Sequence, residues 1–205
     1  MTETAHGVAS SGVAVDGGAP ARPAIQIVPV QGLWVVGVIV AFLITAIAEN
    51  WRWALDFFHV AGGGLWTGID LFVGLVVGPI LGRLSIPARA EFSARFMPKM
   101  VLIMPTVVLM TIAAGFQLAI DLGNLDPTSP NHDWLIVSFI VVGVMAVIAL
   151  GILEPANIAV LFEMKKPVPD GEVIAKLMQR FVYTAGILGL MQVATLVIMT
   201  RVATQ

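Results

Sequence analysis

Residues 56–82 read DFFHVAGGGLWTGIDLFVGLVVGPILG. This stretch is long and apolar enough to cross a bilayer, yet it contains three ionisable side chains and three consecutive glycines. Residues three, four, seven or eleven positions apart share one face of a helix, so one stripe should contain Asp56, His59, Gly63, Trp66 and Asp70. A charge that faces lipid costs at least about 2.5 kcal/mol. We therefore expect the stripe to face protein or a water-filled cavity.

The composition of the whole chain places it in a membrane. Of its 205 residues, 58% are hydrophobic and only 12% are charged, and the mean hydropathy is +0.94. Such a chain has too few polar side chains to cover a water-soluble globule, so we predict an all-α integral membrane bundle whose main partner is the lipid bilayer. It has no cysteine, which excludes disulfides, thiolate metal sites and covalent c-type haem. The net charge of -2 indicates no nucleic-acid partner.

Five apolar segments are long enough to be transmembrane helices. They lie at about residues 32–48, 54–82, 100–122, 134–162 and 181–200. Residues 1–24 are rich in small residues without a sustained period, which predicts a disordered tail before one membrane domain at residues 25–205. Between the second and third spans, residues 83–99 are expected to form a short amphipathic helix in the headgroup region.

The basic residues predict the orientation of the chain. With five spans and a cytoplasmic amino terminus, nine of the eleven Lys and Arg residues would be cytoplasmic, and only Arg52 and Arg201 would lie outside. Cytoplasmic loops of membrane proteins carry an excess of Lys and Arg. We therefore predict a cytoplasmic amino terminus, which includes the tail, and an external carboxyl terminus.

Two carboxyl groups are predicted at similar depth in different spans. At about 1.5 Å rise per helical residue, Asp70 lies roughly 20 Å and Glu154 roughly 17 Å from the basic residues that end their spans. If they face each other, at least one should hold a proton, which predicts a catalytic role in a proton relay or a cation site. Pro155 supports this by freeing a backbone carbonyl one turn earlier. Alternatively, each carboxyl makes only an interhelical hydrogen bond, with Gln192, Tyr183 or a threonine.

A second set of residues suggests a cofactor. His59 and His132 are predicted near the same outer interface, and two histidines from neighbouring helices are the minimum for a bis-imidazole b-type haem. Gly63 and its glycine neighbours leave room where a planar cofactor could lie, on the stripe that also contains Trp66. The alternatives are that the glycines permit close helix packing and that His132 is an ordinary loop residue.

Copper is the metal alternative. Soft thioether ligands suit Cu(I), and three methionines share a face at the start of the third span, namely Met97, Met100 and Met104. Methionine is also an ordinary filler of apolar gaps, so both interpretations stay open. His59 is the predicted metal ligand for either haem or copper.

The segment FFHVAGGGLWTGIDLFVGLVVGPILGRLSIPARAEFSARFMPKM resembles a broad set of small bacterial membrane proteins. In these, a His is followed about seven residues later by Trp-x-Gly, then by a Pro and a basic loop, and the matching residues here are His59, Trp66, Gly68 and Pro79. The set includes the copper-resistance CopD-like proteins, the HemJ-type protoporphyrinogen oxidases and a related uncharacterised group, which the fourth span resembles most. The resemblance implies a helical bundle in the bacterial inner membrane, with a b-type haem on His59 or a role in copper uptake.

Three functional hypotheses follow. The first is a redox-associated inner-membrane protein that binds b-type haem or quinone through His59 and passes protons by Asp70 and Glu154, either as an enzyme or as an anchor for other membrane subunits. The second is a copper or cation permease that uses the carboxyl groups and methionines. The third is a structural membrane subunit without chemistry. Within the predicted spans we find neither a nucleophile paired with a base nor a phosphate-binding loop.

Overall fold

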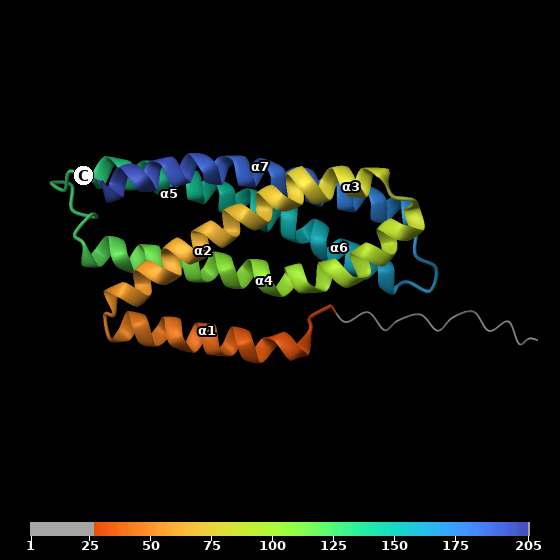
Figure 1. The fold of residues 1–205 in the computed structure, drawn as a ribbon, viewed down its shortest axis with the longest axis horizontal. Helices are drawn as coiled ribbons and strands as arrows, with labels where there is room; N and C mark the ends of the chain where they lie inside the picture. The colour runs from red at the N-terminus through yellow and green to blue at the C-terminus, as the bar shows by residue number, and fades with distance from the viewer. Residues whose placement is uncertain (1–26, 205) are drawn as a thin grey trace, which may run out of the picture.

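The computed structural model describes residues 27–204, and all regular structure within that range is helical (Figure 1). The predicted tail at residues 1–24 lies outside the described residues. In chain order the elements are α1 (Val30–Ala48), α2 (Arg52–Phe72), η1 (Val73–Val77), α3 (Gly78–Arg83), α4 (Ile86–Asp121), α5 (His132–Ile148), η2 (Ala149–Leu153), α6 (Glu154–Lys165) and α7 (Gly171–Ala203). The elements η1 and η2 are single π-helical turns that join α2 to α3 and α5 to α6 without a break.

Five continuous helical stretches are long and apolar enough to cross a membrane. They are Val30–Ala48, Arg52–Arg83, Ile86–Asp121, His132–Lys165 and Gly171–Ala203. The prediction of an all-α protein with five spans is therefore confirmed, and the chain is a multi-pass membrane protein whose apolar outer surface contacts lipid.

Two helices begin well before the predicted spans. The short amphipathic helix expected at residues 83–99 is not an element of its own, because residues 86–99 are the first part of α4, where the Ser93 and Met97 side chains are completely buried. Its apolar face packs against protein. Similarly, α7 begins at Gly171, where the side chain of Asp170 caps the helix by accepting from the backbone N–H groups of Glu172 and Val173.

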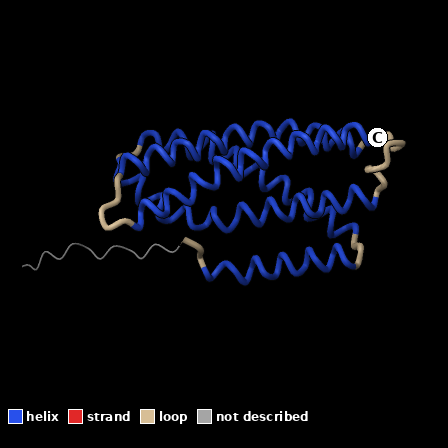
Figure 2. The backbone as a smooth tube through the Cα atoms, turned by 180° about the vertical axis from the view of Figure 1, so that it is seen from behind, coloured by secondary structure: helices blue, strands red, loops and turns tan. Residues whose placement is uncertain are grey.

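The helices run along the long axis of the molecule, and α2 crosses diagonally from α1 toward α7 (Figure 1). One end contains the start of α1 and the α3–α4 and α6–α7 connections, whereas the other contains the α1–α2 and α4–α5 connections and the carboxyl terminus (Figure 2). Most basic residues lie in the first of these halves. Eight of the ten described ones are there, namely Arg83, Arg89, Arg95, Lys99, Lys165, Lys166, Lys176 and Arg180.

Glycine allows the α2–η1–α3 helix to pack closely against α7. A Cβ atom at Gly74 would overlap the backbone of Gly186, and one at Gly189 would lie 2.9 Å from the Leu71 backbone nitrogen. Farther along, a Cβ atom at Gly78 would overlap the Val182 side chain. The paired residue numbers rise on one helix as they fall on the other, so the two helices are antiparallel. Small residues at such a crossing let membrane helices approach closely.

Candidate functional site

Asp70 lies at the centre of a buried polar cluster between α2 and α7. Its side chain is only 2% exposed, and the Gln192 Nε2 atom donates a 2.7 Å hydrogen bond to its Oδ2 atom. The indole of Trp66, one turn earlier on α2, lies beside the same carboxyl group. Both side chains are themselves buried. The Asp70 carboxyl group is therefore fixed in orientation by groups from two helices.

Glu154 is the first residue of α6 and the second carboxyl group of the cluster. It is half-buried, and its charge acts on Asp70. No hydrogen bond joins the two carboxyl groups in the described part of the chain. The structure thus brings the two predicted relay residues within electrostatic reach of one another. The hydrogen bond between Asp70 and Gln192 is also the contact expected if Asp70 has only a structural role.

Two buried amide side chains near these carboxyl groups have unused hydrogen-bonding atoms. Asn157 lies beside the Glu154 carboxyl group and is 1% exposed, yet neither its Nδ2 nor its Oδ1 atom has a partner among the described residues. The Oε1 atom of Gln192 is also without one. Leaving a buried polar group unsatisfied costs about 1–3 kcal/mol, so native proteins seldom do so without a reason. The unused atoms are where a water molecule or ion would bind.

Both carboxyl groups lie next to a π-helical turn. The η1 turn begins three residues after Asp70, and η2 ends at the residue before Glu154. The backbone N–H of Glu154 donates to the carbonyl of Ala149, five residues back, and the N–H of Gly78 donates likewise to Val73. Single π turns inside α-helices occur frequently at functional sites.

Proline explains the position of each π turn. A proline has no N–H to donate, and its ring clashes with the carbonyl four residues earlier. For Pro79 that carbonyl belongs to Leu75, and for Pro155 it belongs to Gly151. These are the central residues of η1 and η2. The wider turn separates the ring from the carbonyl. The backbone carbonyl that Pro155 was expected to leave without a partner near Gly151 is thus part of a π turn. The sequence did not predict this turn.

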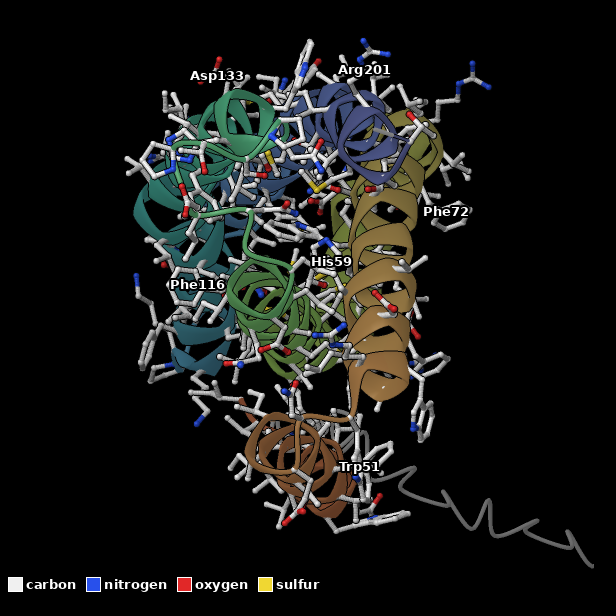
Figure 3. All side chains as sticks on the ribbon, turned by 90° about the vertical axis from the view of Figure 1, so that its left-hand side faces the viewer. Trp51, His59, Phe72, Phe116, Asp133 and Arg201 are labelled. Carbon is white, nitrogen blue, oxygen red and sulfur yellow. The ribbon has the colours of Figure 1, made fainter. Side chains whose placement is uncertain are left out.

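His59 is bound to α4. Its Nδ1 atom lies 2.9 Å from the backbone oxygen of Thr111, and because a carbonyl oxygen can only accept, Nδ1 is the donor. A Cβ atom at Gly115 would overlap the imidazole ring, so glycine at this position makes room for it. Figure 3 shows His59 between α2 and α4.

His132, the other predicted haem ligand, is the first residue of α5 and lies near Asp126 of the preceding loop. Its neighbour Asp133 is seen beside α5, away from His59 (Figure 3). The bis-histidine haem on His59 and His132 stays a prediction.

The glycine face of α2 is occupied by α4. A Cβ atom at Gly62 would overlap the Thr111 hydroxyl, and one at Gly63 would lie 3.7 Å from the Thr111 methyl group. These glycines permit close helix packing, which is the alternative weighed for them. Trp66 lies beside the Asp70 carboxyl group, and a cofactor on this face stays a prediction.

The remaining predicted residues have simpler positions. Asp56 is exposed, so the expected inward stripe is wrong at its first residue. The three methionines proposed for copper, Met97, Met100 and Met104, are buried in the hydrophobic core. Over the described residues, no group of three or more His, Cys, Asp or Glu side chains is placed to hold a metal ion.

Comparison with known proteins gave no relative from which a function could be transferred. No family model matches the chain, and searches of curated proteins and of solved structures found no match. The resemblance to CopD-like and HemJ-type proteins therefore stays a prediction.

Proposed function

We propose that this multi-pass membrane protein exchanges protons inside its bundle, with Asp70 and Glu154 as the exchanging groups. The observation that carries the proposal is the Asp70 carboxyl group, which is buried between two spans and held by Gln192 at 2.7 Å. Ionisable groups inside membrane spans are costly and characteristically mark ion pathways and proton relays.

The two oxygen atoms of the Asp70 carboxyl group have different roles in the proposed proton exchange. Gln192 occupies Oδ2 of Asp70, and Oδ1 is the other oxygen that a proton could reach. Two nearby carboxylates repel each other in a medium of low dielectric constant, and a proton on either one relieves that repulsion. A water molecule bound by the unused amide atoms of Asn157 would connect the groups, because it both donates and accepts hydrogen bonds.

We also propose which membrane contains the protein and how the protein is oriented in it. We place the protein in the bacterial inner membrane with a cytoplasmic amino terminus, because the half with most of the basic residues is also the half in which α1 begins. Proton exchange would serve a redox reaction, either through a cofactor at His59 or through a partner subunit that this protein anchors. The Nδ1–H of His59 donates to a backbone carbonyl, as is usual for histidines that bind a metal through Nε2, so Nε2 is the ring nitrogen that would face a cofactor.

Infrared difference spectroscopy during a pH titration tests proton exchange directly. We expect the reconstituted protein to show a carboxylic acid band that changes with pH and that is lost in Asp70→Asn. The matched control is Asp56→Asn, which removes an exposed carboxyl group from the same helix and should leave the band unchanged. Glu154→Gln should shift the pH at which the Asp70 band changes, because the Glu154 charge acts on Asp70.

One result would refute the proposal. If Asp70→Asn changes only the thermal stability and every carboxyl band remains, Asp70 makes a structural hydrogen bond to Gln192 and exchanges no proton.

A further inference from the structure

A groove runs along the contact between α3 and α7, and it begins one helical turn beyond Asp70, at Gly74. Its volume is about 380 Å³. One side is formed by Gly78, Pro79 and Gly82, the other by Met178 and Val182. We propose that this groove binds an anionic phospholipid, with an acyl chain entering beside Gly82 and the headgroup phosphate at Arg89.

The groove is open to the outside at Gly82. Three glycines four residues apart line it, Gly74, Gly78 and Gly82. At Gly74 and Gly78 the helix packs against Gly186 and Val182 of α7, so these two glycines form the closed floor of the groove. A Cβ atom at Gly82 would meet no other atom within 4 Å. The space beside Gly82 is therefore outside the packed interior, where an acyl chain can enter from the bilayer.

Arg89 supplies a fixed positive charge at the end of this groove. Its Nε atom donates to the backbone oxygen of Leu84 at 2.9 Å, and its Nη2 atom donates to that of Gly82 at 2.8 Å. A guanidinium group has five N–H donors, so three remain for another acceptor. The groove contains no acidic side chain, and the Gln179 amide also lines it. Such a set favours a phosphate group, which accepts several hydrogen bonds from arginine.

The charge of the surrounding half of the bundle favours the same ligand. Residues 83–99 and 163–180, at this end of the bundle, contain the eight basic residues and only four acidic ones, Glu91, Glu163, Asp170 and Glu172, which gives a net charge of +4. A basic surface at the membrane interface attracts anionic lipids. An uncharged amphiphile such as a quinone would gain nothing from this field, so the charge distribution favours an anionic phospholipid.

Native mass spectrometry of the full chain, released from micelles that contain phosphatidylglycerol and phosphatidylethanolamine, tests the proposal. We expect one phosphatidylglycerol to be retained in preference to phosphatidylethanolamine. Gly82→Phe fills the groove from a position with free space and should reduce this retention about tenfold. Gly68→Phe is the matched control, because a Cβ atom there also meets nothing within 4 Å and Gly68 lies outside the groove.

The contribution of the charge is tested by Arg89→Gln, which we expect to lower phosphatidylglycerol retention about tenfold. The control is Arg95→Gln, since Arg95 lies on the same helix but forms an exposed ion pair with Glu91. Arg89 also holds the α3–α4 turn, so its loss could unfold the protein; Gly82→Phe tests the site without removing those hydrogen bonds.

Three outcomes would overturn the proposal. Equal retention of the two phospholipids would show that the groove does not distinguish an anionic headgroup from a zwitterionic one. Equal retention by Gly82→Phe and Gly68→Phe would place the bound lipid elsewhere. Displacement by millimolar inorganic phosphate, or by an added short-chain quinone, would show that the ligand is a free anion or an uncharged ring compound instead.

Discussion

Replacing Gly74 by alanine tests the contact that sets the distance between α2 and α7. The new Cβ atom would overlap the Cα and backbone nitrogen atoms of Gly186. Backbone atoms cannot rotate away as a side chain can, so the two helices must separate locally. Because Asp70 lies one turn from Gly74, we also expect its hydrogen bond to Gln192 to lengthen.

The magnitude follows from two opposing effects. Adding a methylene-sized group to a well-packed site typically costs about 1–3 kcal/mol. Alanine is also favoured over glycine within a helix by about 1 kcal/mol, which offsets part of that cost. We therefore expect Gly74→Ala to lower the free energy of unfolding by up to about 2 kcal/mol. At Gly64 the same Cβ atom meets nothing within 4 Å, so Gly64→Ala should leave stability unchanged or raise it by up to about 1 kcal/mol.

Reversible unfolding by sodium dodecyl sulfate in mixed micelles, followed by far-UV circular dichroism, measures these differences. Gly186→Ala should give an intermediate effect, because its Cβ atom would lie 3.3 Å from the Gly74 Cα atom. If Gly74→Ala and Gly64→Ala unfold at the same detergent fraction, the close contact does not exist and the packing argument fails.

Three other predictions concern sites outside that contact. Glu163→Gln should destabilise the protein more than Glu91→Gln in the same unfolding assay. Glu163 is buried and also accepts a hydrogen bond from the Asp170 backbone N–H, whereas the ion pair of Glu91 is exposed. Equal destabilisation by the two substitutions would contradict this. The backbone N–H and hydroxyl of Thr128 hold the pKa of Asp126 below its usual value, so Asp126 stabilises the loop above the ordinary aspartate pKa and loses that effect as the pH falls through its folded-state value. Thr128→Val should raise this pKa, as measured by the NMR shift of the carboxyl carbon, and an unchanged titration would refute the role of the hydroxyl. Haem binding through His59 requires a Soret band in the purified protein that is lost in His59→Ala, and a colourless wild-type preparation would exclude it.

The sequence was sufficient for the spans but not for the full length of two helices. Hydropathy identifies the residues that lipid surrounds, and these form the middle of each helix. The first turns of α4 and α7 contain polar and charged residues, so they do not look like membrane spans. They are nevertheless helical because residues such as Met97 and Ile174 pack within the protein. Hydropathy alone does not detect this burial.

For the candidate site, the sequence indicated which polar residues matter but not how they pair. Depth along each span placed Asp70 and Glu154 at one level, whereas lateral position depends on how five helices pack around one another. Proline marks the two π turns, yet Pro98 and Pro105 lie inside α4 without one. A proline alone is therefore not sufficient to predict a π turn.

The placement of Gly74 next to Asp70 has a physical reason. Lipid tails are as apolar as the helices, so no hydrophobic force drives the helices together, and an interhelical hydrogen bond in a membrane contributes on average only about 0.6 kcal/mol. The bond between Asp70 and Gln192 is thus too weak to position α7 by itself. The glycine contact one turn away fixes the two backbones first, and the hydrogen bond then forms between side chains already in place. A proton that arrives at Asp70 would consequently change the hydrogen bonding within the cluster while the packing of α2 against α7 is preserved.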